Sequence, residues 1–158
     1  MKEYVNRKKM NGDGKALMIE MINKFGKFNV LLVDDDEELC EIMKFYLYKI
    51  EDIKSIVTVH DGVSASQKLR NQKFDVILLD MRMPRRNGYD LLDEFRDNPF
   101  NSVASVLAMS GTLDMDVLTI ATYHGVKSFL VKPFDENLFL EKVKGLLIQQ
   151  KENVKVAA

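Results

Sequence analysis

The chain has a single cysteine, Cys40, among its 158 residues. One thiol excludes a framework of disulfide bonds within the chain and is typical of proteins kept in a reducing compartment. The 23 basic and 24 acidic residues nearly balance, so no excess of positive charge indicates binding to nucleic acid. No apolar run approaches the roughly 18 residues of a membrane-spanning helix, and the first residues lack the apolar core of a signal peptide. We therefore expect a cytoplasmic protein that binds neither nucleic acid nor membrane.

Short segments rich in apolar or β-branched residues alternate with segments of helical period. We expect strands at residues 29–33, 55–59, 74–79, 103–109 and 128–131, and helices at about 39–50, 64–71, 89–96, 117–123 and after residue 135. Such alternation predicts right-handed crossovers and a parallel sheet covered on both faces. The expected fold is α/β, a doubly wound five-stranded parallel sheet of order 2-1-3-4-5.

Residues 1–27 precede this pattern and are expected to form an N-terminal extension. Its first half is polar, and from Ala16 the apolar residues recur at helical spacing, which predicts one extra helix with Gly26 at its end. The apolar face of that helix comprises Met18, Met21, Ile22 and Phe25. We expect it to pack on its own domain, residues 28–150, and we expect residues 151–158 to form a polar, frayed tail.

Polar side chains follow the ends of four of the expected strands. Asp34 and Asp35 follow the first strand, Asp80 the third, Ser110 the fourth and Lys132 the fifth. Because the carboxyl ends of parallel strands share one edge, these side chains are expected to converge where strands one and three are neighbours. One aspartate alone would be read as a cap, but several independent strand ends with such residues indicate a site.

Three nearby carboxylates repel one another unless a cation lies between them, and Mg²⁺ prefers oxygen ligands. A carboxylate is also a nucleophile that can form an aspartyl phosphate, with a lysine and a hydroxyl to stabilise the phosphoryl oxygens. The sequence lacks a glycine-rich phosphate-binding loop of the Walker type. The phosphoryl group is therefore expected to come from another protein rather than from bound ATP.

Four segments in order resemble the receiver domain of bacterial two-component response regulators, over roughly residues 28–149. They are Val33-Asp34-Asp35-Asp36-Glu37, Leu79-Asp80-Met-Arg-Met-Pro84-Arg-Arg-Asn-Gly88, Ser110-Gly111 and Val131-Lys132-Pro133-Phe134. The resemblance is to single-domain, chemotaxis-regulator-like receivers and implies a flavodoxin-like fold. Asn87-Gly88 in place of the commoner Asp-Gly, and Ser110 in place of the more frequent threonine, depart from the family pattern.

The resemblance also implies a role for each residue of the site. Asp80 would accept a phosphoryl group from a histidine kinase or a histidine phosphotransfer protein. Mg²⁺ would be bound by Asp34, Asp35, Asp80 and the main-chain carbonyl of Arg82. Residues that would respond to the phosphoryl group are the hydroxyl of Ser110, the ammonium of Lys132 and the aromatic ring of Phe129. The Lys132–Pro133 bond is often cis in this family.

We therefore expect a stand-alone response regulator that is not an enzyme beyond catalysing its own phosphorylation and dephosphorylation. It would either bind a downstream protein target or pass the phosphoryl group on. Two alternatives are an unphosphorylated pseudo-receiver scaffold and an aspartyl-nucleophile phosphatase, which the spacing Asp34-x-Asp36 superficially resembles. Asp36 is otherwise expected to begin a helix, and His60 and His124 are expected to be structural or surface residues.

Overall fold

The computed structural model describes residues 27–111 and 115–157. Its elements in chain order are β1 (Phe28–Val33), α2 (Glu37–Leu47), β2 (Ile53–Val59), α3 (Gly62–Asn71), β3 (Val76–Asp80), α4 (Gly88–Leu91), the 3-10 helices η1 (Leu92–Phe95) and η2 (Val103–Ser105), β4 (Val106–Ser110), α5 (Met115–Tyr123), β5 (Ser128–Val131) and α6 (Glu136–Ala157). The helix expected in the extension lies outside the described residues. The division into extension, domain and tail stays a prediction.

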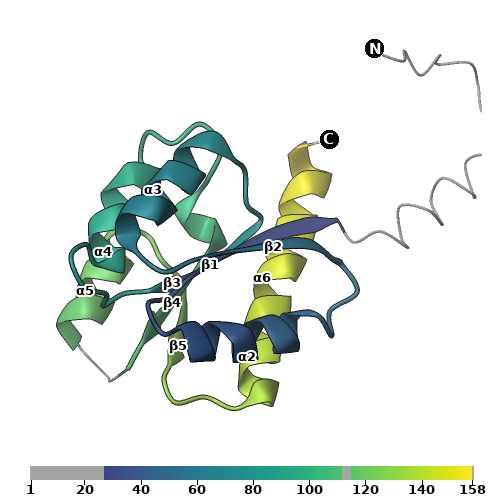
Figure 1. The fold of residues 1–158 in the computed structure, drawn as a ribbon. Helices are drawn as coiled ribbons and strands as arrows, with labels where there is room; N and C mark the ends of the chain where they lie inside the picture. The colour runs from purple at the N-terminus through teal and green to yellow at the C-terminus, as the bar shows by residue number, and fades with distance from the viewer. Residues whose placement is uncertain (1–26, 112–114, 158) are drawn as a thin grey trace, which may run out of the picture.

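The strands form one parallel sheet of order β2-β1-β3-β4-β5, which confirms the expected topology (Figure 1). The register places Val33 opposite Leu79, Asp80 opposite Met109, and Ser110 opposite Val131. All the strands therefore end at one side of the sheet, which we call the carboxyl edge. The opposite side, where the strands begin, is the amino edge.

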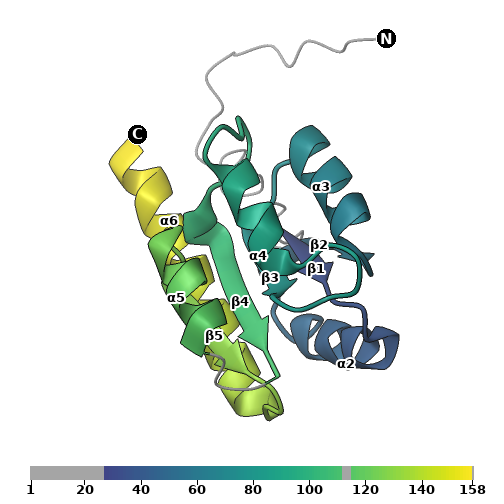
Figure 2. The ribbon, with the colours of Figure 1, turned by 90° about the vertical axis from the view of Figure 1, so that its left-hand side faces the viewer.

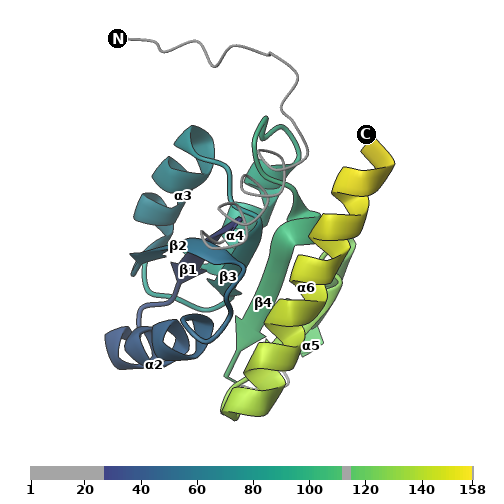
Figure 3. The ribbon, with the colours of Figure 1, turned by 90° about the vertical axis from the view of Figure 1, so that its right-hand side faces the viewer.

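Helices cover both faces of the sheet, as the doubly wound arrangement predicts. Strand residues such as Leu31 and Leu79 pack toward α3, α4 and α5 (Figure 2), and their neighbours Leu32 and Leu78 pack toward α2 and α6 (Figure 3). Every residue of β3 is buried, since the strand has helices on both sides. This explains why β3 reads as a continuous apolar run rather than as an alternating one.

Aspartate side chains begin three of the helices. The carboxylates of Asp36, Asp61 and Asp135 accept backbone N–H groups in the first turns of α2, α3 and α6, at 2.8 to 3.0 Å. Each satisfies donors that have no partner within the helix. The role expected of Asp36 at the start of a helix is therefore confirmed, and Asp61 and Asp135 cap their helices in the same way.

Three local expectations differ from the structure. The helix expected over residues 89–96 is α-helical only to Leu91 and continues as 3-10 turns, and the first residues of the expected fourth strand form η2 instead. In η2 the hydroxyl of Ser102 accepts the N–H of Ala104, which favours a turn over a ladder. The residues from Lys151 to Ala157, expected to fray, continue α6. No helix within the described ranges combines the length and apolarity required to cross a lipid bilayer.

Asn101 connects the chain before β4 to the elements beside it. Its side-chain oxygen accepts the N–H of Phe74 at 2.8 Å, and its amide nitrogen donates to the carbonyls of Leu69 and Gln72, each at 2.8 Å. Asn101 is 4% exposed, so these bonds replace water that cannot reach the backbone. One side chain thereby joins the end of α3, the start of β3 and the segment leading into β4.

We predict that Asn101→Ala destabilises the fold by about 3 kcal/mol, because two or more buried backbone groups lose their partners. Chemical denaturation monitored by circular dichroism measures this loss. The matched control is Asn71→Ala, since Asn71 is exposed and its amide donates to Gln67 O; there the change should stay below about 0.5 kcal/mol. Equal effects of the two substitutions would contradict the role assigned to Asn101.

Candidate functional site

Backbone hydrogen bonds hold the main chain of the residues at the carboxyl edge in place. The N–H of Asp34 donates to the carbonyl of Val59 at 3.2 Å, and the N–H of Lys132 donates to the carbonyl of Ser110 at 2.7 Å. Asp80 is the last residue of β3, and Ser110 is the last residue of β4. The sheet ladder therefore extends to the first residues of the loops and places their side chains in register.

Three carboxylates meet at this edge. Asp34, Asp35 and Asp80 each offer an oxygen atom, and these atoms lie within 4.8 Å of one another. Asp34 is fully buried and Asp80 is 5% exposed, whereas Asp35 is exposed. The structure thus brings together the three acids that the strand-end pattern predicts, two on the floor of the site and one at its opening.

Lys132 supplies the positive charge of the site. Its ammonium nitrogen lies 2.5 Å from Asp34 Oδ2 and 3.2 Å from Asp80 Oδ2. The remaining oxygens of these acids accept backbone groups, since Asp34 Oδ1 accepts the N–H of Asp36 and Asp80 Oδ1 accepts the N–H of Arg82, both at 3.0 Å. The two buried carboxylates are therefore paired and oriented.

The crowding of charge changes the ionisation of Asp80 and Lys132. Burial, with the charge of Asp34 adding to it, raises the pKa of Asp80 from 3.8 to about 6, although the Arg82 N–H and Lys132 act in the opposite direction. Burial alone would lower the pKa of Lys132, but the hydrogen bond to Asp34 and the charges of both carboxylates raise it. The lysine therefore stays charged at neutral pH, and about half of the Asp80 side chains keep their proton near pH 6.

The other predicted residues lie around this cluster. Ser110 is 5% exposed at the end of β4, and the exposed Arg82 follows Asp80 by two residues. Phe129 is partly buried on β5 and packs on the α5 side of the sheet. The Lys132–Pro133 peptide bond is cis, as expected.

The loop after Asp80 is held close to the site by its packing. A Cβ atom on Gly88 would lie 2.1 Å from the carbonyl oxygen of Asp80, so only glycine fits there. The side chain of Asn87 accepts the N–H of Met83 at 3.3 Å. Arg86 binds the carboxylate of Glu94 on η1. The loop is therefore anchored at both its backbone and its side chains.

His60 and Cys40 support the site in a way that the sequence did not reveal. His60 Nδ1 lies 2.9 Å from the carbonyl oxygen of Asp34, and the thiol of Cys40 lies 3.5 Å from the same oxygen. Burial, with the charges of Asp34 and Asp36 adding to it, raises the pKa of the Cys40 thiol to about 12. Cys40 is therefore an unreactive packing residue, and His60 has a structural role, which is one of the two roles expected of it.

Asp36 does not join the acidic cluster. Its carboxylate accepts the N–H of Leu39 at 3.0 Å as the cap of α2, and it is absent from the group of three acids found among the described residues. The phosphatase alternative requires Asp34 and Asp36 to act together. Their separate functions argue against it.

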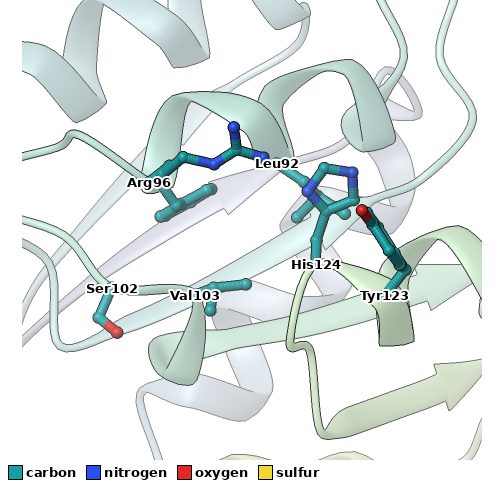
Figure 4. Close-up of a pocket in the computed structure, with 7 residues that line it drawn as sticks. Leu92, Arg96, Ser102, Val103, Tyr123 and His124 are labelled. Carbon is teal, nitrogen blue, oxygen red and sulfur yellow. The ribbon is translucent and has the colours of Figure 1, made fainter.

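Two hollows on the surface differ in their relation to the cluster. A hollow of about 310 Å³ is lined by Lys132, Pro133, Phe134, Gly111, Asp36 and Leu39, so it opens beside the site. A second one, of about 300 Å³, includes Arg96, Ser102, Tyr123 and His124 and lies where α5 ends and the chain enters η2 (Figure 4). That hollow is at the amino edge and shares no residue with the cluster.

Comparison with known proteins agrees with this geometry. The model of the response regulator receiver domain matches residues 30–144. This chain belongs to the response regulator receiver family. The receiver is 34% identical over 111 residues to the transcriptional regulatory protein MalR of Bacillus subtilis, which covers 70% of this chain and 46% of MalR. It is 31% identical over 118 residues to CpxR of Escherichia coli K12, covering 75% of this chain and 48% of CpxR.

The chain thus spans about half the length of these curated relatives. Solved receiver structures match over nearly their whole length. A signal receiver domain from Vibrio parahaemolyticus superposes with a TM-score of 0.73 at 26% identity, covering 84% of this chain and 98% of that one. A CheY-like receiver from Methanospirillum hungatei superposes with a TM-score of 0.69 at 21% identity, covering 81% of this chain and 99% of that one. At this identity the second comparison supports the fold alone.

We predict that Asp80→Asn stabilises the receiver at neutral pH in the presence of a chelator. The folded-state pKa lies above 3.8, so the folded form keeps a proton that the unfolded chain releases, and stability falls as the pH rises from about 4 to about 6. Removing the charge should restore on the order of 2 kcal/mol above pH 6, or roughly 5 °C in Tm.

Thermal unfolding at pH 4.5 and pH 7.5 tests this, with Asp36→Asn as the control because asparagine also caps helices. For Asp80→Asn the rise in Tm over the wild type should be smaller at pH 4.5 than at pH 7.5. For the control no rise should be seen at either pH. An unchanged Tm of Asp80→Asn at pH 7.5 would contradict the raised pKa.

We also predict that Gly88→Ala destabilises the receiver by about 2 kcal/mol and slows any reaction at Asp80, because the new methyl group would displace the Asp80 carbonyl. Gly145→Ala in α6 is the control, since its Cβ would meet nothing within 4 Å and alanine favours helix by about 0.5–1 kcal/mol. Denaturation midpoints of the two variants should therefore move in opposite directions. A neutral Gly88→Ala would contradict the close contact.

Proposed function

We propose that this receiver accepts a phosphoryl group on Asp80 from the phosphohistidine of a kinase or phosphotransfer protein and thereby changes its binding to a protein target. The observation that carries the proposal is that the ammonium of Lys132 binds two buried acids at once, Asp34 and Asp80. An ordinary structural salt bridge needs one acid for one base. Here one lysine binds two acids, and a third acid, Asp35, offers an oxygen atom within 4.8 Å of theirs beside an open hollow.

The donor set fits Mg²⁺. Three carboxylates within 4.8 Å, of which one is exposed, offer hard oxygen ligands and leave room for water or phosphate oxygens. We propose Asp34, Asp35, Asp80 and the main-chain carbonyl of Arg82 as the protein ligands. When bound, the ion would neutralise the oxygens of the acids and of the phosphoryl group during transfer.

The residues of the chain account for the remaining chemistry. A carboxylate oxygen of Asp80 attacks phosphorus, a new P–O bond forms, and the P–N bond to the donor imidazole breaks with its electrons remaining on nitrogen. Lys132 already lies 3.2 Å from Asp80 and can pair with a phosphoryl oxygen. Ser110 ends the adjacent strand, and its hydroxyl can donate a hydrogen bond to a second phosphoryl oxygen.

The switch follows from the same residues. A phosphorylated Asp80 would compete with Asp34 for Lys132 and draw the Ser110 hydroxyl toward it. Phe129 lies between Ser128 and Leu130 on the strand that leads to Lys132, and it packs toward α5. We infer that its ring turns inward when Ser110 moves, so that the surface formed by α5 and β5 is the one that differs between the two states.

The output of the receiver is part of the proposal. Stand-alone action is a prediction, and the curated relatives MalR and CpxR, which are about twice as long, are named transcriptional regulatory proteins. Binding of a target protein and onward transfer of phosphate to a second histidine protein both fit the site. Neither makes the chain an enzyme beyond catalysing its own phosphorylation and dephosphorylation.

Intact-mass spectrometry after incubation with Mg²⁺ and either acetyl phosphate or phosphoramidate tests the chemistry. We expect one phosphoryl group on the wild type and on Asp36→Asn, none on Asp80→Asn, and none when a chelator removes Mg²⁺. Asp36→Asn is the matched control because it changes a neighbouring aspartate whose carboxylate caps α2 and is not one of the three clustered acids.

Each other outcome has a distinct meaning. Addition to Asp80→Asn would show that another residue is the acceptor. No addition to the wild type from either donor would favour the pseudo-receiver alternative. Labelling that persists without Mg²⁺ would contradict the proposed use of the acidic cluster.

A further inference from the structure

A groove at the amino edge has no part in the proposed chemistry. It has a volume of about 520 Å³ and is lined by residues 49–52, in the turn after α2, and by Lys144, Leu147, Ile148 and Lys151 of α6. We call it the α2–α6 groove. Its walls combine the buried side chains of Ile50 and Leu147 with Ile148, which is 56% exposed. Ile148 is thus the apolar side chain that the groove exposes, beside the buried Ile50 and Leu147, and the apolar face of an amphipathic helix can pack on such a surface.

The start of the described chain is attached to the rim of this groove. The N–H groups of Lys27 and Phe28 both donate to the carbonyl of Asp52, at 2.7 and 2.9 Å. The side chain of Asp52 binds Lys151 at 2.6 Å, and the ammonium of Lys151 lies 5.8 Å from the centre of the Phe28 ring. The extension therefore leaves the domain at the groove itself.

The length of the connection limits where the extension can go. Phe25 precedes Lys27 by two residues, so their Cα atoms lie within about 7 Å of each other. Gly26 between them allows a sharp change of direction. The apolar side chains at positions 18, 21, 22 and 25 recur at helical spacing and need an apolar surface to cover them. The α2–α6 groove lies within this reach, because Asp52 in its lining accepts the N–H of Lys27.

Net charge attracts the extension to its own domain, while the rim of the groove carries both signs, with Lys49, Lys144 and Lys151 beside Glu51 and Asp52. Residues 1–27 contain seven basic and three acidic side chains, a net charge of +4. Because the whole chain carries −1, residues 28–158 carry −5. The extension is therefore attracted to its own domain at long range, and the apolar contacts decide the place at short range. Two of the four apolar residues are methionines, which adapt readily to irregular surfaces.

We propose that residues 16–25 form a helix that packs in the α2–α6 groove of the same molecule, with Met18, Met21, Ile22 and Phe25 against Ile50, Leu147 and Ile148. The contact braces the carboxyl-terminal turns of α6, which extend past the sheet (Figures 1 and 3). The groove lies at the amino edge, away from Asp80. The packing is therefore independent of the phosphorylation proposed above.

Disulfide trapping in the full chain tests the contact. Met21→Cys and Glu20→Cys are each combined with Ile148→Cys, since positions 20 and 21 lie on different faces of the expected helix. The native Cys40 is buried and stays unreactive. Under mild oxidation we expect an intramolecular disulfide in the Met21→Cys pair at least about tenfold faster than in the Glu20→Cys pair. Intact mass after alkylation counts the remaining thiols.

Equal rates in the two pairs, or no disulfide in either, would overturn the proposal. Disulfides only between molecules would assign the groove to a second copy and would also overturn it. As a second measurement, Ile22→Asp should speed amide exchange in residues 147–151, whereas Lys24→Asp, on the polar face, should not. Phosphorylation by acetyl phosphate should be unchanged in both variants, so a failure of this proposal cannot be mistaken for a failure of the proposed function.

Discussion

The contact on which the rest of the carboxyl edge depends is the one between Lys132 and two buried acids. Asp34 follows β1, Asp80 ends β3 and Lys132 follows β5, so one ammonium group connects three strands at their ends. Buried carboxylates without a partner would cost several kcal/mol each, and the lysine offsets part of that cost. Three acids and one base still leave two negative charges. Burial, with the charge of Asp34 adding to it, raises the pKa of Asp80. The excess of negative charge accounts for the affinity for a divalent cation that we propose.

Most of this arrangement could be predicted from the sequence, because the carboxyl ends of parallel strands lie side by side at one edge of the sheet. The apolar run before Asp80 ends on a charge and is followed by Pro84, which marks the end of a buried strand in the sequence itself. Once the strands and their order are known, the meeting of Asp34, Asp80 and Lys132 follows without further information. The cap at Asp36 is equally local, since it depends only on the first turn of α2.

What could not be predicted depends on contacts between distant segments. Glu94 is drawn to Ser66 and Arg86, which lie on α3 and on the loop after Asp80, and it belongs to the 3-10 turns where a regular helix was expected. Asn101 looks like an ordinary loop residue until the backbone of Phe74 is placed beside it. His60 likewise has no signal in the sequence, because its contact is the backbone carbonyl of Asp34. Side-chain bonds to a remote backbone leave no pattern in spacing or composition.

The uneven packing of the helices bears on how a change at Asp80 could reach a partner. α3 buries four residues beneath it and α2 buries three, whereas α5 buries only Val117 and Ala121 among its nine residues. Because so little apolar surface is lost when α5 shifts, a small change in free energy can move it, while the same change would leave α2 and α3 in place. Phe129 is only partly buried beneath this face. A helix packed more sparsely than α2 and α3 thus lies next to the strand that leads to Lys132, where a new charge on Asp80 would act first.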